Sequence, residues 1–462
     1  QIVLDERFRE VLDSLRRESV ILVSGKVVKR KEPNPKLETG EIEVVADSLV
    51  LLSRAEPLPF ELFNPEIKTT EETRLKYRYL DLRRPEMQKI LEFRFKAEMI
   101  IRNFFAMHNF VEIETPYLSK PTPEGARDFL VPSRIFKGKF WALPQSPQIY
   151  KQLLMIAGFD RYFQIARCFR DEDLRKDRQY EFTQIDMEMS FVDEEDIMKI
   201  TEKLIATLYA QLLGIELKRP FPRLSWKEAM ERYGSEKPDL RFGCELQDFS
   251  NLFGESGFRI FDTIVKKGGV IKGIVLNENV SKKGIRKADK IARSYGFPGI
   301  AWIKRDNGFY GPISSALPRS TLEEIIGEGS IAFLLGGEWL KVSKALGEIR
   351  SAMGDLLGLK RGLSVLWVTD FPLFEWSEEE KRLKSAHHPF TMPAKGYEKR
   401  LFEDLSLEEL LKIPSRAYDL VINGVEIGGG SIRITDRALQ ERIFEILGIG
   451  KEEAWKKFGM LL

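Results

Sequence analysis

The stretch FRDEDLRKDRQYEFTQIDMEMSFV (residues 169–192) joins a charge-rich segment to one in which polar and apolar residues alternate. Nine charged residues lie between Arg170 and Glu181, and strict alternation begins at Phe182. A period of two indicates a β-strand whose apolar face packs on a core. The opposite, polar face of this predicted strand carries Gln184, Asp186 and Glu188.

The preceding residues 162–170 (YFQIARCFR) are also strand-like, so a ten-residue loop separates two predicted strands. Such a loop is longer than a tight turn, and long loops inside compact domains are often functional. Arg170, at its base, is a forked donor suited to phosphate or carboxylate. Two interpretations remain, a site for an anionic ligand and a hairpin with a solvated outer face.

Composition excludes several classes of protein. A length of 462 residues predicts about three domains, and 43% hydrophobic with 31% charged residues describes a soluble globular chain. No apolar run approaches the roughly 20 residues of a membrane span. With a formal net charge of only +2, nucleic-acid binding would have to be local. Cys168 and Cys244 are too few for a disulfide framework or a cysteine-based zinc site, which fits a reducing cytoplasm.

Residues 1–65 predict the order strand, helix, strand, strand, with basic residues clustered on the turn between the last two strands. These include Lys26, Lys29 and Arg30. A small barrel of the oligonucleotide-binding type without its first strands would have this order, and so would a generic α+β module with a solvated basic turn. Because the chain opens with Gln1 and stops just after a helical pattern, we expect the polypeptide to be longer at both ends.

The next part predicts a long helix, a strand over FVEIETP (110–116) ended by its proline, and a loop over residues 118–134. A helix begins after Pro147 and places Gln148 and Lys151 on one side of its first turn, where they could bind a small carboxylate or face water. From about 245 to 355, strands and helices alternate in what we interpret as an inserted α/β domain. Residues 363–375 then return the chain to the earlier sheet.

The segment YDLVINGVEIGGGSIRI (418–434) contains Asn423-Gly424, a strong signal for a two-residue hairpin turn. Pairing across that turn puts Val421 opposite Glu426, so Asp419 shares a face with Glu426. Two converging carboxylates favour a hard divalent cation such as Mg²⁺, which usually brings phosphates with it. The alternative is a solvent-exposed acidic pair. The glycines at 428–430 would leave bare backbone for a ligand.

Together these motifs resemble class II aminoacyl-tRNA synthetases, specifically the bacterial-type aspartyl enzymes. FVEIETP resembles the first class signature and residues 169–186 the second, while RYLDLR (78–83) is typical of the aspartyl, asparaginyl and lysyl subgroup. Four further motifs narrow the resemblance to the aspartyl enzymes: PTPEGARDFLVPSR, LPQSPQIYKQ, AHHPFT and GVEIGGGSIR. The family's Gly-rich third signature, expected after the KFGMLL end, is not among these residues.

The resemblance implies an α/β multidomain fold with a catalytic domain built on an antiparallel sheet flanked by helices. It divides the chain into a partial OB-fold anticodon-binding domain (1–65), a linker (66–90), the first part of the catalytic domain (91–244), an inserted bacterial-type α/β domain (245–360) and the second part of the catalytic domain (361–462).

The resemblance also implies the site. Arg170 is the expected catalytic residue, bridging the amino-acid carboxylate and the ATP α-phosphate. The expected aspartate-binding residues are Glu124, Ser146, Gln148, Lys151, Arg170, Gln184, Asp186, His387 and Arg433. The expected ATP-binding residues are Arg170, Asp171, Glu172, Gln179 and Glu426. Asp419 and Glu426 are expected to hold Mg²⁺, and Lys26, Lys29 and Arg30 to bind tRNA.

By the same resemblance, the implied activity is an aspartate–tRNA ligase of the cytoplasm that acts as a homodimer, with ATP, Mg²⁺ and L-aspartate as small-molecule partners. Its nucleic-acid partner is tRNA(Asp), with tRNA(Asn) left open. The missing third signature motivates one alternative, a catalytically inactive tRNA-binding paralogue. A second alternative changes the substrate to asparagine or lysine, but Lys151 and Arg433 argue against it, because two cations would face an amide or an ammonium.

Overall fold

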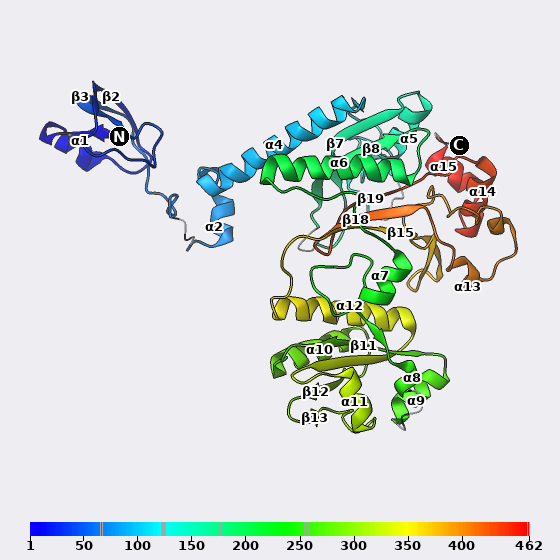
Figure 1. The fold of residues 1–462 in the computed structure, drawn as a ribbon. Coiled ribbons are helices and arrows are strands. Elements are labelled where there is room, and N and C mark those ends of the chain that lie inside the picture. The colour runs from blue at the N-terminus through cyan, green and yellow to red at the C-terminus, as the bar shows by residue number, and fades with distance from the viewer. Residues whose placement is uncertain are drawn as a thin grey trace. The chain divides into compact units, whose positions relative to one another are not determined.

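The computed structural model describes residues 1–64, 66, 68–121, 126–174, 178–253, 256, 258–459 and 461. It divides into two compact units, Gln1–Met99 and Ile100–Leu462. Helices and strands are mixed along the whole chain (Figure 1). Within the described ranges, no helix is long and apolar enough to cross a membrane.

The first unit contains a sheet in the order β1-β3-β2, in which β2 and β3 are antiparallel and β1 is parallel to β3. Its elements are β1 (Ile2–Val3), η1 (Glu6–Phe8), α1 (Arg9–Ser14), β2 (Val20–Lys29) and β3 (Ile42–Ser53). Phe8 packs on Ala46 and Leu49. The predicted order is confirmed, but Lys26 and Lys29 lie within β2 and not in the turn, because the strand runs further than its apolar residues suggest.

Three helices follow, α2 (Glu71–Lys76), α3 (Arg78–Asp81) and α4 (Pro85–Met107). The end of α4 begins the core of the second unit, where Phe104 and Phe105 pack on Phe163 and on Ile200 of α6 (Glu194–Leu213). A capping box from Asp193 starts α6. This core supports a sheet in the order β4-β7-β8, formed by β4 (Val111–Glu112), β7 (Arg161–Phe169) and β8 (Glu181–Met189).

The alternation that opens at Phe182 does form a strand, but its better covered face is the polar one. Asp186 is only 4% exposed and stands opposite Gln164, which is also 4% exposed. On the apolar face, Ile185 is 42% exposed, and Phe191 beyond the strand is fully exposed. The prediction that the apolar face packs on a core is confirmed for Met187 and Met189, which lie against the cluster that contains Phe163, whereas Ile185 at the middle of the strand stays exposed.

The second sheet has the order β19-β18-β15-β9, from β9 (Arg223–Ser225), β15 (Val365–Thr369), β18 (Ala417–Ile422) and β19 (Val425–Ser431). Strand β15 pairs with β9, so residues 363–375 do return the chain to strands that precede the insertion. The prediction of one antiparallel sheet needs correction. The described strands form two sheets here, and β4–β7 and β15–β9 are parallel, since each pair is joined by a long connection.

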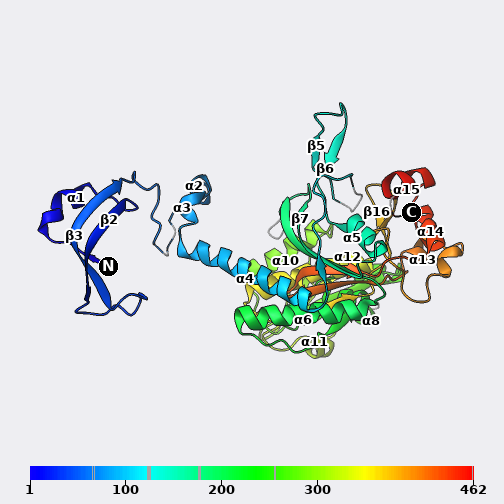
Figure 2. The same cartoon turned by 90° about the horizontal axis from the view of Figure 1, so that it is seen from above.

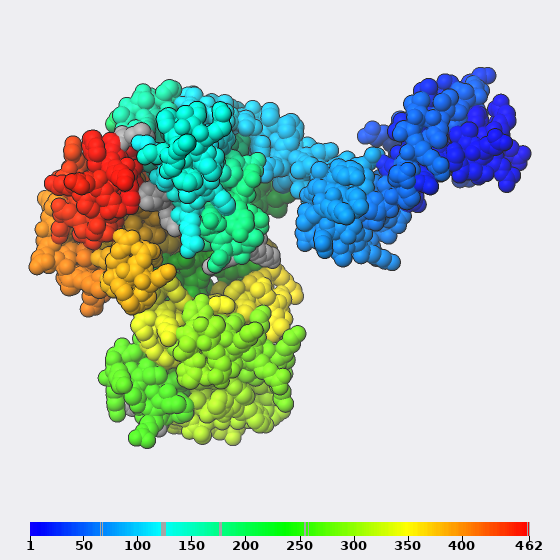
Figure 3. Space-filling model, turned by 180° about the vertical axis from the view of Figure 1, so that it is seen from behind, coloured from blue at the N-terminus to red at the C-terminus, as the bar shows by residue number. Residues whose placement is uncertain are grey.

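Residues 247–356 build a further sheet with the order β10-β11-β14-β12-β13, in which every pairing is antiparallel. Its elements are β10 (Gln247–Asp248), α8 (Ser250–Phe253), α9 (Arg259–Lys266), β11 (Val270–Leu276), α10 (Lys282–Ser294), β12 (Ala301–Arg305), β13 (Phe309–Tyr310), α11 (Arg319–Ile325), β14 (Ile331–Gly337) and α12 (Trp339–Leu356). Alternate residues of β11 and β14 supply a core on each face, one under α10 and α12, the other under α8, α9 and α11. Residues 247–356 form a distinct lobe of the second unit (Figure 3).

The remaining elements lie around the β4-β7-β8 and β19-β18-β15-β9 sheets of the second unit. They are α5 (Gln148–Ile156), α7 (Trp226–Tyr233), the hairpins β5 (Leu130–Pro132) with β6 (Phe140–Ala142) and β16 (Phe374–Ser377) with β17 (Arg382–Ser385), η2 (Arg400–Phe402), α13 (Leu407–Leu410), α14 (Arg437–Ile446) and α15 (Lys451–Phe458). The predicted loop 118–134 therefore ends in a strand, and the β5–β6 hairpin projects from the body (Figure 2).

Candidate active site

The first turn of α5 lies over the polar face of β8. Gln148 and Lys151 lie on one side of the helix, as their spacing predicted, and both are buried, which decides against the alternative that they face water. The Lys151 Nζ donates to Asp186 Oδ1 at 2.7 Å and lies 3.3 Å from Glu188 Oε2. A lysine buried at this depth needs such partners, because an unpaired ammonium out of water is costly.

Arg433, just beyond the end of β19, connects the two sheets. Its Nη2 donates to Gln148 Oε1 at 2.9 Å, and its Nη1 donates to Ser431 Oγ at 2.7 Å. Its Nε lies 3.7 Å from Glu188 Oε1. Glu188 therefore sits between Lys151 and Arg433, and the pocket alternates two cations with two carboxylates.

The charges of this group stabilise one another. Burial lowers the pKa of Lys151, but the carboxylates of Asp186 and Glu188 outweigh that effect and raise it, so the amine stays protonated. The neighbouring His388 behaves oppositely, since burial and the cations Arg433 and Lys151 hold its pKa well below the usual range. His388 is therefore neutral near pH 7, and its Nδ1 accepts from the Phe390 backbone N–H at 3.1 Å.

Several buried polar atoms around this pocket have no hydrogen-bond partner. Among the described residues they include Gln148 Nε2, Asp186 Oδ2, His387 Nδ1 and Arg433 Nε. Leaving such atoms unpaired costs about 1–3 kcal/mol each, so groups of this kind indicate a ligand. The unpaired amide and guanidinium N–H groups fit a carboxylate, and the free oxygen of Asp186 fits an ammonium.

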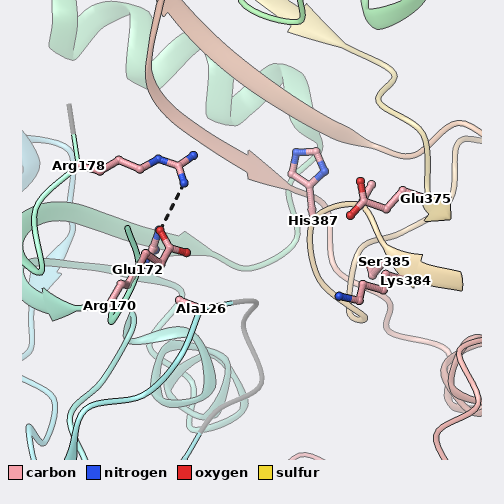
Figure 4. Close-up of a pocket in the computed structure, with 9 residues that line it drawn as sticks. Ala126, Arg170, Glu172, Arg178, Glu375, Lys384, Ser385 and His387 are labelled. Atoms are coloured by element: carbon pink, nitrogen blue, oxygen red, sulfur yellow. Dashed lines mark hydrogen bonds and ion pairs between the residues drawn. The ribbon is translucent and has the colours of Figure 1, made fainter. Parts of the chain in front are cut away.

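Arg170 lies at the end of β7, where its backbone N–H donates to the Tyr180 carbonyl at 2.8 Å and closes the base of the loop. Its guanidinium lies over the Phe182 ring, 5.0 Å from the centroid. Beside it is a cavity of about 440 Å³. Figure 4 shows Arg170, Glu172 and Arg178 on one side of this cavity, with His387, Glu375 and Lys384 facing them. The Arg178 Nη1 pairs with Glu172 Oε2 at 3.4 Å.

The predicted hairpin is confirmed, with Val421 opposite Glu426 and positive φ at both turn residues, Asn423 and Gly424. A bulge between Leu420 and Val421 shifts the register beyond the turn, so Asp419 stands opposite Gly429. Loss of surrounding water and the negative charge of Asp419 raise the pKa of Glu426. The two carboxylates are therefore close enough to repel, as the hairpin geometry predicted.

These carboxylates fit one part of a magnesium site. In the described parts of the chain, no group of three or more His, Cys, Asp or Glu side chains could hold a metal alone. Mg²⁺ commonly binds one or two carboxylates and completes its shell with water and substrate phosphates, which matches a pair with uncompensated charge. His387 Nε2 lies 3.9 Å from Asp419 Oδ1 at the same edge.

The glycines after this pair do less for ligand access than the sequence suggested. A Cβ atom at Gly429 would overlap the Asp419 carboxylate, and one at Gly430 would press on the Tyr418 ring at 3.0 Å. Only Gly428 has open space beside it. Side chains at positions 429 and 430 would therefore displace groups of the facing strand β18.

Residues 70–462 match the family of class II tRNA synthetases described by the letters D, K and N. The chain belongs to this family.

Curated relatives in this class II family extend over the whole chain. An aspartate–tRNA(Asp/Asn) ligase of Aquifex aeolicus is 50% identical over 100% of this chain and 80% of its own length. The ligase of the same name from Thermotoga maritima is 48% identical with the same coverage. An aspartate–tRNA ligase of Clostridium acetobutylicum is 45% identical over 97% of this chain and 76% of its own length. These names lend no support to the inactive paralogue.

The structure brings most of the residues expected in the pocket together. Ser146 Oγ accepts from the Gln148 backbone N–H at 3.2 Å, and Gln184 on β8 accepts from Cys168 Sγ at 3.3 Å. The Asp171 backbone N–H donates to the Arg127 carbonyl at 3.0 Å, and Gln179 is exposed on the loop. Glu124 lies outside the described residues. Arg30 Nε lies 3.8 Å from Glu43 Oε2 in the first unit.

Sequence reasoning missed part of the site. The omitted residues are Arg178, Glu188, Glu375, Lys384, His388 and Ser431. Glu188 carried a usable signal, because it shares the parity of Asp186 on β8. Glu375 and Lys384 carried no such sequence signal, since only the β16–β17 pairing and its position over the cavity bring them to the site.

Proposed function

We propose that this class II synthetase is an aspartate–tRNA ligase. It joins L-aspartate to the AMP part of ATP, forming aspartyl-adenylate and releasing pyrophosphate, and then transfers the aspartyl group to the 3′ end of tRNA(Asp) with release of AMP. The names of relatives at 45–50% identity support this choice within the family. We include tRNA(Asn) as a second acceptor, because the relatives from Aquifex and Thermotoga are named for both tRNAs.

The observation that carries the proposal is the pair of cations around unpaired buried atoms. We assign the side-chain carboxylate of aspartate to Lys151 and Arg433, with Gln148 as a further donor. The substrate ammonium then binds the free oxygen of Asp186. Asparagine would turn an NH₂ donor toward a cation, and a pocket of paired polar groups rejects such an analogue strongly.

Activation needs no nucleophilic side chain, because the α-carboxylate of aspartate itself attacks the α-phosphate of ATP. A bond forms between a carboxylate oxygen and the α-phosphorus as the bond from the α-phosphorus to the pyrophosphate oxygen breaks. Negative charge grows on the phosphoryl oxygens. We assign Arg170 to stabilise that charge, with Glu172, Asp171 and Gln179 holding the nucleotide beside the cavity. Catalysis would then consist of positioning and electrostatic stabilisation.

Asp419 and Glu426 would hold Mg²⁺ with the ATP phosphates. When bound, the ion neutralises phosphate charge and orients the nucleotide. Without it, the raised pKa of Glu426 reflects loss of water and repulsion by Asp419, which a divalent cation would relieve.

We further propose that the first unit is a partial OB-type barrel whose Lys26, Lys29 and Arg30 contact the tRNA anticodon, and that residues 245–360 are the insertion of the bacterial form. We also propose a cytoplasmic homodimer. Helix α4 supports the dimer, because Ile90, Phe95 and Met107 are each at least 60% exposed.

ATP–pyrophosphate exchange tests the activity. We expect exchange that depends on aspartate and is weaker by several orders of magnitude with asparagine or lysine, followed by charging of tRNA(Asp). The same assay on Lys151→Met should lose exchange, whereas Lys412→Met, which removes an exposed lysine paired with Glu408, should keep it. An active preparation that prefers asparagine or lysine would refute the proposal.

A further inference from the structure

The turn of the β18–β19 hairpin is anchored on both sides. On one side Asn423 Oδ1 accepts from the Ser364 backbone N–H, and the Asn423 N–H donates to the Ser364 carbonyl, each at 2.9 Å. On the other side, Arg241 Nη2 donates to the Asn423 carbonyl at 3.4 Å. Glu426 follows this turn by two residues, so anything that fixes the turn also limits where its carboxylate can lie.

Arg241 is itself held by Asp239. Its backbone N–H and Nε donate to Asp239 Oδ1 at 3.1 and 2.9 Å, and its Nη2 donates to Oδ2 at 2.6 Å. Burial raises the pKa of Asp239, but the bonds from Arg241 outweigh it and lower the pKa, so the pair stays charged. Asp239 also packs directly on the turn, because a Cβ atom at Gly424 would lie 2.9 Å from the Asp239 Cβ.

The segment that carries this pair is fixed in turn by helix α12. Arg350 is 2% exposed and donates to the carbonyls of Asp239, Phe242, Gly243 and Cys244 at 2.8–3.0 Å. Its guanidinium also lies over the rings of Phe242 and Tyr233, at 4.1 and 4.9 Å from their centroids. An arginine that satisfies four backbone carbonyls and two rings leaves the segment little freedom.

We propose that Arg241, together with Asp239, is a positioning residue for the Asp419–Glu426 carboxylate pair, and that Arg350 couples the inserted residues to that pair. The inference rests on the proposed function only where it assigns this pair to Mg²⁺ and ATP.

The aspartate pocket does not depend on this route. Gln148 and Lys151 come from α5, and Asp186 comes from β8. Arg433 lies beyond the bulge at the far end of β19 from the turn. Loosening the turn should therefore affect Mg²⁺ and ATP more than aspartate, a split that general loss of structure would not produce.

The test compares the whole chain with Arg241→Leu, the conservative Arg241→Lys and a control, Arg232→Leu. Arg232 makes a similar forked pair with Glu245, at 2.9 and 2.7 Å, outside the hairpin. The readouts are hydrogen–deuterium exchange of the 418–430 peptides without ligands, the half-saturating Mg²⁺ concentration and the KM for aspartate in ATP–pyrophosphate exchange, and the melting temperature.

We expect Arg241→Leu to speed deuterium uptake in 418–430 and to raise the half-saturating Mg²⁺ concentration by about twofold to thirtyfold, the range expected for a residue that acts through an intermediate contact. The KM for aspartate should stay unchanged, Arg241→Lys should lie between wild type and Arg241→Leu, and Arg232→Leu should match wild type. Unchanged deuterium uptake and an unchanged Mg²⁺ dependence would overturn the proposal. An equal rise in the half-saturating Mg²⁺ concentration and in the KM for aspartate, together with a collapsed melting temperature, would also overturn it. A wild-type chain without aspartate-dependent exchange would refute the proposed function, while deuterium uptake would still decide the positioning role.

Discussion

Arg433→Leu should weaken aspartate activation and reduce the preference for aspartate over asparagine. Arg433 makes hydrogen bonds of 2.9 and 2.7 Å through its two Nη atoms. Its Nε lies 3.7 Å from Glu188 Oε1 and makes no hydrogen bond. A hydrogen bond to a charged group contributes about 1.5–3 kcal/mol, and a guanidinium can give a carboxylate two of them. Losing both would cost about 3–6 kcal/mol, which lowers kcat/KM for aspartate by about 100-fold to 10,000-fold.

Asparagine should lose less, because its side-chain oxygen accepts only one such bond and its NH₂ gains nothing from a cation. The ratio of kcat/KM for aspartate to kcat/KM for asparagine should therefore fall by the contribution of about one hydrogen bond, which is roughly 10-fold to 100-fold. ATP–pyrophosphate exchange with each amino acid measures both values. Arg437→Leu is the matched control, since Arg437 is exposed and pairs only along its helix with Glu441. A variant that keeps the full preference for aspartate would show that Arg433 does not contact the side chain.

Arg170→Ala should abolish exchange with little loss of thermal stability, because its guanidinium faces a cavity; a collapsed melting temperature would make it structural instead. Asp419→Asn and Glu426→Gln should each raise the Mg²⁺ concentration needed for activity, and an unchanged Mg²⁺ titration would exclude them from the metal site. Because the folded state raises the pKa of Glu426 above 4.5, its charge destabilises the metal-free chain at neutral pH. Glu426→Gln should therefore stabilise that chain at pH 7.5, and the gain should vanish as the pH falls toward 4.5, measured by denaturant unfolding; a pH-independent gain would contradict this reasoning.

Local patterns predicted the elements well. The Asn423-Gly424 turn, the start of α5 after Pro147 and the alternation of strands and helices from 245 to 355 were all confirmed. Each depends on hydrogen bonds between residues close in the chain, or on the φ that a turn residue accepts. Of the site residues that came from motifs, Gln148, Lys151, Asp186 and Arg433 were also brought together, whereas Glu124 lies outside the described residues.

Other expectations failed where distant segments decide the environment. The sequence left open whether the polar face of β8 is solvated, because Asp186 is buried by its pairing with Lys151 of α5 and no pattern within 181–189 contains that information. The strands form two sheets joined through Arg433 and Glu188, where one antiparallel sheet was predicted. Gly429 serves the Asp419 carboxylate across the hairpin, which depends on a bulge that the turn alone does not predict.

The sequence by itself determined the family, the hairpin that carries Asp419 and Glu426, and the helix turn that pairs Gln148 with Lys151, because each rests on neighbours in the chain. Only the tertiary structure decided that Glu188 lies between Lys151 and Arg433, that Arg241 reaches the hairpin turn, and that Arg350 holds the segment that carries Arg241. The contacts of Arg433 with Glu188, of Arg241 with Asn423 and of Arg350 with Asp239 join residues more than a hundred positions apart. Their strength comes from burial in water-poor surroundings, which exists only once the segments have packed together.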